Sequence, residues 1–422
     1  MNFLQALVIV YQATIQYARR YAALAREMAK TAQGRQRQEL EKIADICEWV
    51  PANPARSFHE AVQTLWFTHV LMQLEAKANG ISPGRADQYL YPYYRRDIDE
   101  GRLTKEEAIE LLECLRVKMS TQRNFSIKSF LEVTSGEAQF HNVTLGGHTP
   151  DGKDATNELS YLFLEAAFRT RTPHHTLSIR CHDNLSEDFL LKAAELAATG
   201  NGWPAFFNDK PNIEILMDMG ASLEEARDYA ISGCTTPQIP GKSGPLEPFG
   251  LILVKPLELA LRDGVDPFTG KQLGPKTGKF EDFKTYDELV EAYKKQTRYF
   301  SHEGAKYFNR HRALLEAMVP RLFDSGLIDD CIKRGKSASG AGPRYWYHYQ
   351  LARGMIDAVD SLAAIKKCVY EDGSVGKQEL MDALDANFEG KEDVRRLLLS
   401  APKYGNDDDY VDSIAHDLYD WW

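Results

Sequence analysis

The feature that most constrains the fold is an alternation of short apolar runs with stretches of helical character after Phe140. The runs span 140–145, 176–180, 204–207 and 229–232, and the helical patterns lie at about 155–170, 186–199, 211–219 and 222–230. Strands separated by helices of this length favour parallel pairing. The sequence therefore predicts an α/β fold whose functional groups lie on loops at the carboxyl ends of the strands.

Helical spacing of apolar residues dominates the rest of the chain. It predicts helices at about 3–30, 39–50, 58–76 and 105–119, the last opened by a capping-box pattern of Thr104 and Glu107. After a surface excursion rich in glycine, proline and lysine at 264–282, further helices are predicted at about 286–319, 351–370 and 376–388. We therefore divide the chain into a mainly helical part (1–130), strand–helix units with a cysteine loop (131–260), and the excursion with a second helical part (261–422).

Composition argues against several classes of function. The 422 residues are 43% hydrophobic, which is ample for a large core, and carry a net charge of −10 with basic residues spread along the chain. This argues against nucleic acid as the main partner. No apolar run approaches the roughly 18 residues of a membrane span, and the amino terminus indicates an amphipathic helix rather than a signal peptide. The six cysteines lie far apart without a CxxC pair, which favours the reduced cytoplasm over a zinc site or a disulfide framework.

One cysteine has an unusual context. Cys234 lies in ISGCTTPQIPGKSGP, where glycine and proline constrain the loop, whereas an ordinary structural cysteine is a buried thiol. Nucleophilic catalysis would need a base to form the thiolate, and no histidine lies within 50 residues before it or 65 after it. Radical chemistry needs no thiolate. The local sequence therefore favours hydrogen abstraction by a thiyl radical, although a distant histidine could still be brought close by the fold.

Two other motifs are weaker. Gly241-Lys242-Ser243 resembles the end of a phosphate-binding loop, but the required first glycine is Thr236 and no suitable helix follows. The cluster around Arg180 and His182, together with His174-His175, could suggest a metal site. Because a second ligand group is missing, polar groups at a strand end explain the cluster better.

Many ordered segments resemble pyruvate formate-lyase-like glycyl radical enzymes over essentially the whole chain. They include SFHEAVQTLWF, NGISPGRADQYLYPYYRRDIDEGRLTKEEAIELLECL, FHNVTLGG, GNGWPAFFNDK and EEARDYAISGC. The resemblance implies a helical amino-terminal region and part of a ten-stranded α/β barrel, made of two parallel five-stranded half-sheets with the cysteine on an inner loop. Cys234 matches the family's thiyl cysteine.

The chain departs from the family where the radical is stored. The family's glycyl loop has an Arg-Val-x-Gly-aromatic pattern, whereas the only Arg-Val here is Arg116-Val117, followed by Lys118. We therefore expect a central portion without the glycyl radical domain, inactive as an isolated chain, which is either a fragment or a partner-dependent subunit. The resemblance implies that no cofactor binds this chain. It also implies a partner activase that uses S-adenosylmethionine and an iron–sulfur cluster, and it is compatible with a homodimer.

Further departures bear on the reaction. Thr235 follows Cys234 where pyruvate formate-lyase has a second cysteine, which disfavours acetyl transfer to coenzyme A. Eliminating members of the family carry glutamate two residues after the cysteine, where this chain has Thr236, and Trp-His-Asp where it has Leu246-Glu247-Pro248. Their diol dehydratases carry His-Ser where it has Asn79-Gly80. A threonine hydroxyl cannot act as a base near neutral pH. We therefore expect carbon–carbon cleavage or radical addition, with dehydration or another carbon–heteroatom elimination as the alternative, in which Glu247 would act as substitute base.

The candidate site follows from these comparisons. Cys234 is the catalytic residue, and the predicted lining of the substrate pocket is Thr235, Thr236, Glu247, Asn79, Ser82, Arg180 and His182. The aromatic run at 345–349 fits an apolar pocket and core packing equally well.

Overall fold

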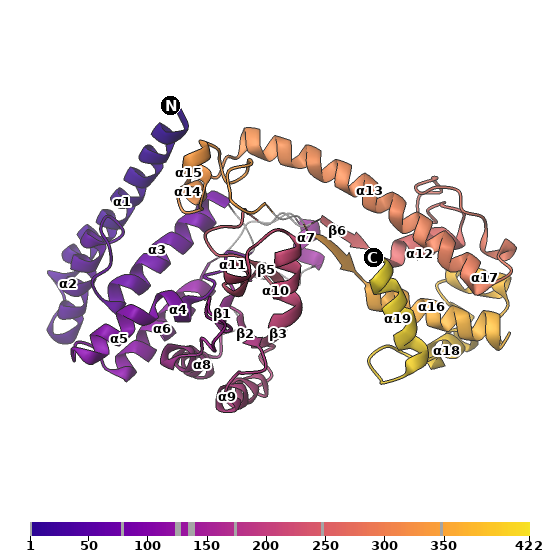
Figure 1. Cartoon of the computed structure of the whole chain (residues 1–422), viewed down its shortest axis with the longest axis horizontal. Coiled ribbons are helices and arrows are strands. Elements are labelled where there is room, and N and C mark those ends of the chain that lie inside the picture. The colour runs from indigo at the N-terminus through magenta and orange to yellow at the C-terminus, as the bar shows by residue number, and fades with distance from the viewer. Residues whose placement is uncertain are drawn as a thin grey trace. The chain divides into compact units, whose positions relative to one another are not determined.

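The computed structural model describes residues 2–76, 80–122, 128–133, 140–172, 175–245, 249–346 and 349–422. They form two compact units (Figure 1). Unit 1 comprises Met1–Leu246 and Leu315–Tyr347, and unit 2 comprises Glu247–Leu314 and His348–Trp422.

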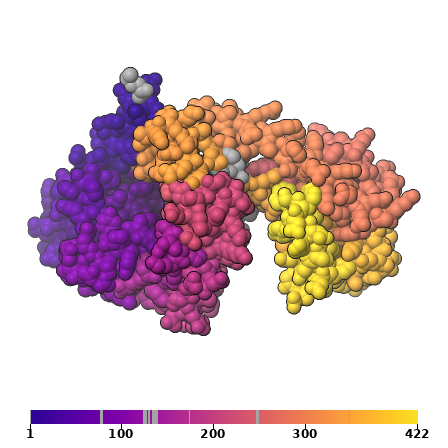
Figure 2. All heavy atoms as spheres, viewed as in Figure 1, coloured from indigo at the N-terminus to yellow at the C-terminus, as the bar shows by residue number. Residues whose placement is uncertain are grey.

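The amino-terminal part of unit 1 is helical, as predicted. Its helices are α1 (Asn2–Ala29), α2 (Gly34–Trp49), α3 (Phe58–Ala76), α4 (Ala86–Tyr89), α5 (Tyr91–Asp99), α6 (Lys105–Ser120) and α7 (Lys128–Val133). The predicted capping box opens α6, because the Thr104 side chain accepts from the Glu107 N–H and the Glu107 carboxylate accepts from the Thr104 N–H. Helix α1 lies at the surface of unit 1 (indigo in Figure 2), and its buried stripe is mostly alanine.

A parallel sheet follows. Its strands β1 (Val143–Gly146), β2 (Leu177–Cys181) and β3 (Ala205–Asn208) pair in that order, and Gly84 adds a parallel bridge to Val143. Helices α8 (Glu158–Thr170), α9 (Glu187–Ala197), α10 (Asp209–Asp218) and α11 (Leu223–Arg227) follow the strands. Both the parallel pairing and the alternation of strands with helices are confirmed. All of β1 is buried, as expected for a parallel strand covered on both faces.

The fourth predicted run behaves differently. It forms β4 (Ala230–Ser232), which pairs antiparallel with β5 (Thr236–Gln238) instead of joining the parallel sheet. The parallel sheet of the described residues therefore has three strands, and the ten-stranded barrel implied by the family resemblance stays a prediction. Unit 1 also contains α14 (Leu322–Ser325) and α15 (Cys331–Arg334).

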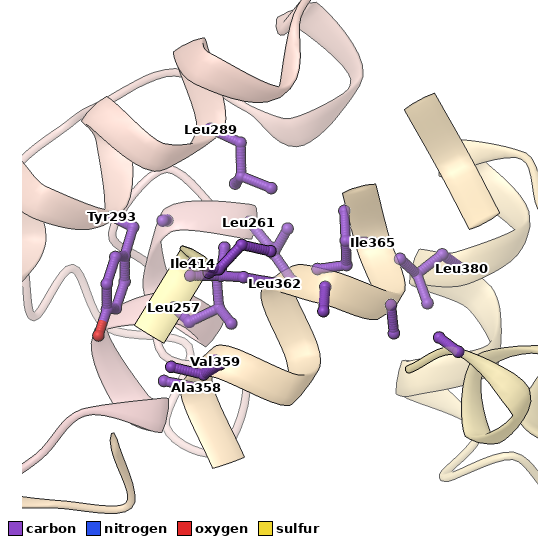
Figure 3. Packing of buried hydrophobic residues seen from close by; sticks show 14 of the residues in the cluster. Leu257, Leu261, Leu289, Tyr293, Ala358, Val359, Leu362, Ile365, Leu380 and Ile414 are labelled. Carbon is purple, nitrogen blue, oxygen red and sulfur yellow. The ribbon is translucent and has the colours of Figure 1, made fainter. Parts of the chain in front are cut away.

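Unit 2 has its own hydrophobic core. Strands β6 (Phe249–Ile252) and β7 (Gln350–Arg353) pair in parallel. The helices are α12 (Val254–Leu261), η1 (Phe280–Asp282), α13 (Tyr286–Met318, in this unit up to Leu314), α16 (Met355–Ile365), the π-helical turn η2 (Lys366–Glu371), α17 (Lys377–Asp385), α18 (Glu392–Ser400) and α19 (Asp409–Trp421). Figure 3 shows side chains of α12, α13, α16 and α19 meeting around Leu362.

One boundary in unit 2 was predicted wrongly. The helix expected from residue 351 begins at Met355, because the residues before it form strand β7. Gly354, with φ +70°, makes the turn between the strand and the helix.

Candidate active site

Cys234 lies at the tip of the β4–β5 hairpin. The turn consists of Gly233, Cys234 and Thr235, and Gly233 adopts φ +62°, a left-handed conformation that favours glycine. The Cys234 thiol is exposed among the described residues, with its Sγ 3.9 Å from Thr235 Oγ1. Pro237 lies opposite Ile231 and has no N–H group to donate to the neighbouring strand. The predicted position of the cysteine on a constrained loop is thus observed.

The loop that carries Ser82 packs against this turn. Ser82 Oγ accepts hydrogen bonds from the Gly233 N–H (2.9 Å) and the Asn142 N–H (3.2 Å). Gly80 approaches so closely that an added Cβ would lie 3.0 Å from Gly233 Cα and 3.1 Å from the Phe140 carbonyl oxygen. The structure therefore brings Ser82 to the backbone of the cysteine turn. Its role toward a substrate stays a prediction.

The two threonines after the cysteine differ in exposure. Thr235 is exposed beside Cys234, whereas Thr236 is buried as the first residue of β5. Asn79 and Glu247 lie outside the described residues. Of the residues predicted to line the pocket after the cysteine, Thr235 therefore offers the most accessible hydroxyl among those that the structure describes.

Arg180 is fully buried, and its hydrogen bonds go to protein groups. Its Nε and Nη2 donate to the two carboxylate oxygens of Asp209, both at 2.8 Å. Nη1 donates to the carbonyls of Arg227 (2.8 Å) and Tyr229 (3.0 Å). Burial alone would raise the pKa of Asp209, but the hydrogen bonds and charge of Arg180 hold it below its ordinary value. The guanidinium is thus engaged immediately before β4.

His182 belongs to a neighbouring polar cluster. Its ring lies 4.1 Å, centroid to centroid, from that of His148, and its Nε2 lies 3.6 Å from Asp154 Oδ1. Burial, followed by the proximity of His148, lowers the pKa of His182. Within the part of the chain that the structure describes, no three histidine, cysteine or acidic side chains are arranged to hold a metal ion.

The segment after the hairpin is held by hydrogen bonds within unit 1. Ser243 Oγ accepts from the Ile239 N–H at 3.0 Å, and the Gly244 N–H donates to the Tyr345 carbonyl at 2.9 Å. The Tyr345 hydroxyl donates to Glu225. The glycine–lysine–serine motif therefore forms a tight turn, and Tyr345 makes a structural contact, while residues 347 and 348 of the aromatic run lie outside the described residues.

The whole chain, residues 1–422, matches the family described as pyruvate formate lyase-like. The chain belongs to this family. It is 40% identical to an isethionate sulfite-lyase of Nitratidesulfovibrio vulgaris over 428 residues, covering 99% of this chain and 51% of the relative. It is 36% identical to a trans-4-hydroxy-L-proline dehydratase of Clostridioides difficile, covering 99% and 53%. A solved glycyl radical enzyme from Archaeoglobus fulgidus superposes with a TM-score of 0.89 at 33% identity, covering 97% and 52%.

The chain thus spans about half the length of the curated relatives it matches. The predicted membership of the pyruvate formate lyase-like family is confirmed, and the α/β architecture with a helical amino-terminal region agrees with the solved relative. Among the described residues, the helices lack the combination of length and apolar character needed to cross a membrane.

Sequence reasoning missed three residues that surround the hairpin. Thr144 Oγ1 accepts from the Ile231 N–H at 2.9 Å, Asp209 pairs with Arg180, and Asn142 Nδ2 donates to Ser178 Oγ at 2.7 Å. The signal that could have found Asp209 is its position directly after a strand, at the edge of the sheet where functional groups gather. Thr144 could have been noticed as a polar residue in an otherwise apolar buried strand, and Asn142 as a polar residue directly before it.

Proposed function

We propose that the complete enzyme containing this chain is a radical lyase that eliminates a leaving group from a carbon–oxygen or carbon–sulfur bond. The observation that carries the proposal is the position of Cys234, exposed at the tip of an anchored hairpin in a member of this family. The names of the relatives, a sulfite-lyase and a dehydratase, support elimination more than the carbon–carbon cleavage or radical addition that the sequence favoured.

Cys234 would carry the hydrogen transfers. Its thiol would give up its hydrogen atom to a glycyl radical, which a radical S-adenosylmethionine activase would install and which would supply the oxidising equivalent. The sulfur then takes a hydrogen atom from a substrate carbon that bears a hydroxyl group, so that an S–H bond forms and a C–H bond breaks. The leaving group departs from the adjacent carbon with its electron pair, and the hydroxyl loses its proton. The resulting carbonyl-stabilised radical regains a hydrogen atom from the S–H group, which restores the sulfur radical.

The two threonines that follow Cys234 bear on which group leaves the substrate. Hydroxide is a poor leaving group and needs an acid, whereas sulfite departs as a stable anion. Thr235 and Thr236 carry neutral hydroxyls that are neither acids nor bases near neutral pH. The hairpin therefore suits the expulsion of a stable anion from a small hydroxylated substrate better than the loss of water.

A second candidate is carbon–carbon cleavage, such as decarboxylation, or radical addition. The same two neutral threonines favour it, because these reactions need no carboxylate at the hairpin to protonate a leaving hydroxide. This candidate lacks the support that elimination receives from the relatives' names.

The test uses the complete protein, activated without oxygen by a radical S-adenosylmethionine activase. Isethionate, trans-4-hydroxy-L-proline, propane-1,2-diol and an arylacetate are supplied separately. We expect sulfite and acetaldehyde from isethionate as the fastest reaction. We also expect Cys234→Ser to abolish turnover while the glycyl radical stays detectable by electron paramagnetic resonance. Turnover by the Cys234→Ser variant would contradict the role of the cysteine, and activity on the arylacetate alone would support the second candidate instead.

A further inference from the structure

From Tyr229 to Gly233, the main chain that leads to Cys234 is bound along one edge at every second residue, and the end of the preceding helix is bound as well. The carbonyls of Arg227 and Tyr229 accept from Arg180, the Ile231 N–H donates to Thr144, and the Gly233 N–H donates to Ser82. Arg227 ends helix α11, and the chain is extended from Tyr229 onward, where alternate residues present their main-chain groups to the same edge. Side chains of the sheet and of the Ser82 loop therefore take the place of a neighbouring strand.

The opposite edge of β4 pairs with β5. Ala230 lies opposite Gln238, and Ser232 lies opposite Thr236. The two β4 residues whose main-chain groups are not bound on the first edge, Ala230 and Ser232, are therefore the ones that face β5. An isolated two-stranded hairpin is marginally stable in water. The contacts of the first edge, made by Ser82, Thr144 and Arg180, are thus needed to fix the hairpin; we call these three residues the hairpin anchor.

Asp209 holds the arginine of the anchor in place. It binds the Arg180 guanidinium through both oxygens and also accepts from the Tyr229 hydroxyl (2.8 Å) and His148 Nδ1 (2.7 Å). The Arg180 guanidinium carbon lies 3.9 Å from the centroid of the Tyr229 ring. Both charged side chains are almost completely buried. A buried ion pair is tolerated only when its geometry and remaining hydrogen bonds are satisfied, and here they are.

The backbone leaves room for this arrangement. A Cβ added to Gly147, directly after β1, would lie 2.4 Å from the guanidinium carbon of Arg180. Arg85 also links this segment to the end of β1. Its Nη1 donates to Asp228 Oδ1 (2.7 Å), and its Nη2 donates to the Gly146 carbonyl (3.0 Å). Residues 227–229 are therefore held by two buried arginines just before β4 begins.

We propose that the Arg180–Asp209 pair is a positioning pair that sets the location of Cys234 for hydrogen transfer. Transfer between sulfur and carbon requires close approach in a defined orientation, and misplacement by about 1 Å can lower a rate on the order of a hundredfold. The pair lies away from the thiol and acts through the β4 backbone. This inference rests on the proposed role of Cys234, and it does not depend on which substrate is used.

The first measurement uses the 422-residue chain and needs no activity. In Asp209→Asn the side chain keeps its shape and loses the charge that orients Arg180. We expect amide hydrogen exchange in residues 230–238 to rise about tenfold as this local opening becomes easier. The matched control is Asp97→Asn, because Asp97 is also buried and accepts from Arg102 and the Phe58 N–H, away from the hairpin. It should lower stability and leave exchange in the hairpin unchanged.

The second measurement uses the complete activated enzyme. Asp209→Asn should lower kcat about tenfold or more, with KM within about twofold and an unchanged glycyl radical content, because binding is retained and only the approach of the sulfur is disturbed. Equal hairpin exchange in Asp209→Asn and Asp97→Asn would overturn the inference, as would equal kcat. If Asp209→Asn does not fold, Tyr229→Phe removes one hydrogen bond to Asp209 and should change both quantities in the same direction; no change would overturn the inference too.

The two proposals fail separately. If Cys234→Ser retained turnover, the proposed function would fall while the exchange result still decided whether the pair anchors the hairpin. If exchange in the hairpin did not respond, the positioning role would fall and the chemistry of Cys234 would stand.

Discussion

At the scale of single residues, buried charges in unit 1 are compensated to different extents. Arg180 and Asp209 satisfy each other through two hydrogen bonds. Asp324, also buried, lies 3.8 Å from Arg321, and its Oδ1 has no hydrogen-bond partner. Burial raises the pKa of Asp324 to about 7, with Arg321 opposing and Glu75 adding to the shift. Because burial disfavours the charged form more than Arg321 stabilises it, this carboxyl group is expected to hold its proton in the folded chain up to about pH 7.

The raised pKa of Asp324 predicts a dependence of stability on pH. The folded chain keeps the proton up to about pH 7, whereas the unfolded chain releases it near the ordinary aspartate pKa of 3.8. This contribution is therefore complete below pH 3.8 and is lost as pH rises toward 7. Asp324→Asn cannot ionise, and we expect it to be more stable than the wild type at pH 8 by up to about 4 kcal/mol, the equivalent of a pKa shift from 3.8 to about 7.

Thermal or urea unfolding at pH 5 and pH 8 measures this effect. The difference between Asp324→Asn and the wild type should grow with pH. An equal difference at both values would show that Asp324 is already ionised in the folded chain.

At the scale of elements, the cysteine hairpin depends on a close backbone contact with the Ser82 loop. The φ angle of Gly80 is not in the left-handed region, so other residues could adopt its backbone conformation. A glycine is needed at this position because a Cβ would come too close to Gly233. A Cβ at this position, 3.0 Å from Gly233 Cα, must displace one of the two backbones by a few tenths of an ångström. The turn bearing Cys234 should therefore shift.

We expect Gly80→Ala to lower kcat of the complete activated enzyme about tenfold while costing roughly 1 kcal/mol of stability. Gly376→Ala is the control, because its added Cβ would meet nothing nearer than 3.8 Å. Steady-state kinetics and thermal unfolding of both variants check the prediction. A Gly80→Ala enzyme with wild-type kcat would mean that the turn adjusts without moving the sulfur.

Local patterns predicted most elements well. Helix α3 was predicted with the bounds it has, the capping box placed the start of α6, and the four runs located β1 to β4 within three residues. The antiparallel pairing of β4 with β5 was missed because Pro237 argues against a strand at that position, and the contacts of Ser82 and Thr144 with the other edge of β4 come from distant parts of the chain. Strand β7 was missed because its residues continue smoothly into the apolar pattern of α16.

In the candidate site, too, local sequence predicted some features, and contacts between distant parts of the chain determine the others. Glycine and proline around Cys234 identified the loop from local sequence alone. Asp209 escaped attention because an aspartate that begins a helix is an ordinary helix-start residue, favourable near the helix amino terminus. Only the register that places Cys181 beside Asn208 brings Asp209 to Arg180.

At the scale of the whole molecule, each unit has a separate hydrophobic core. Leu112 on α6 is fully buried in the core of unit 1, and Leu362 on α16 is fully buried in the core of unit 2. Regions with separate cores can open as separate cooperative units. A destabilising substitution in one core should therefore lower the stability mainly of the unit that contains it.

We expect Leu362→Ala to destabilise unit 2 by about 2–5 kcal/mol, through the lost burial and the cavity left behind. Hydrogen exchange should rise in α16 and α19 and remain unchanged in α6. Leu112→Ala is the reciprocal control, with exchange rising in α6 and not in α16. A rise across both units in either variant would show that the chain unfolds as one cooperative body.

The hairpin anchor has a consequence for how this family can change its chemistry. The hydrogen bonds of Ser82, Thr144 and Arg180 to the segment from Arg227 to Gly233 go to main-chain atoms, and Arg180 also stacks on the ring of Tyr229. Apart from the glycine that makes the turn, they place no demand on the side chains that follow. The positions that follow Cys234 are therefore exchangeable: residue 235 in the turn, and residue 236 at the start of β5, can be replaced during evolution, or by design, while the sulfur keeps its location. One scaffold could in this way acquire acids, bases or neutral hydroxyls beside the same thiol, and so pass from one substrate to another without rebuilding its core.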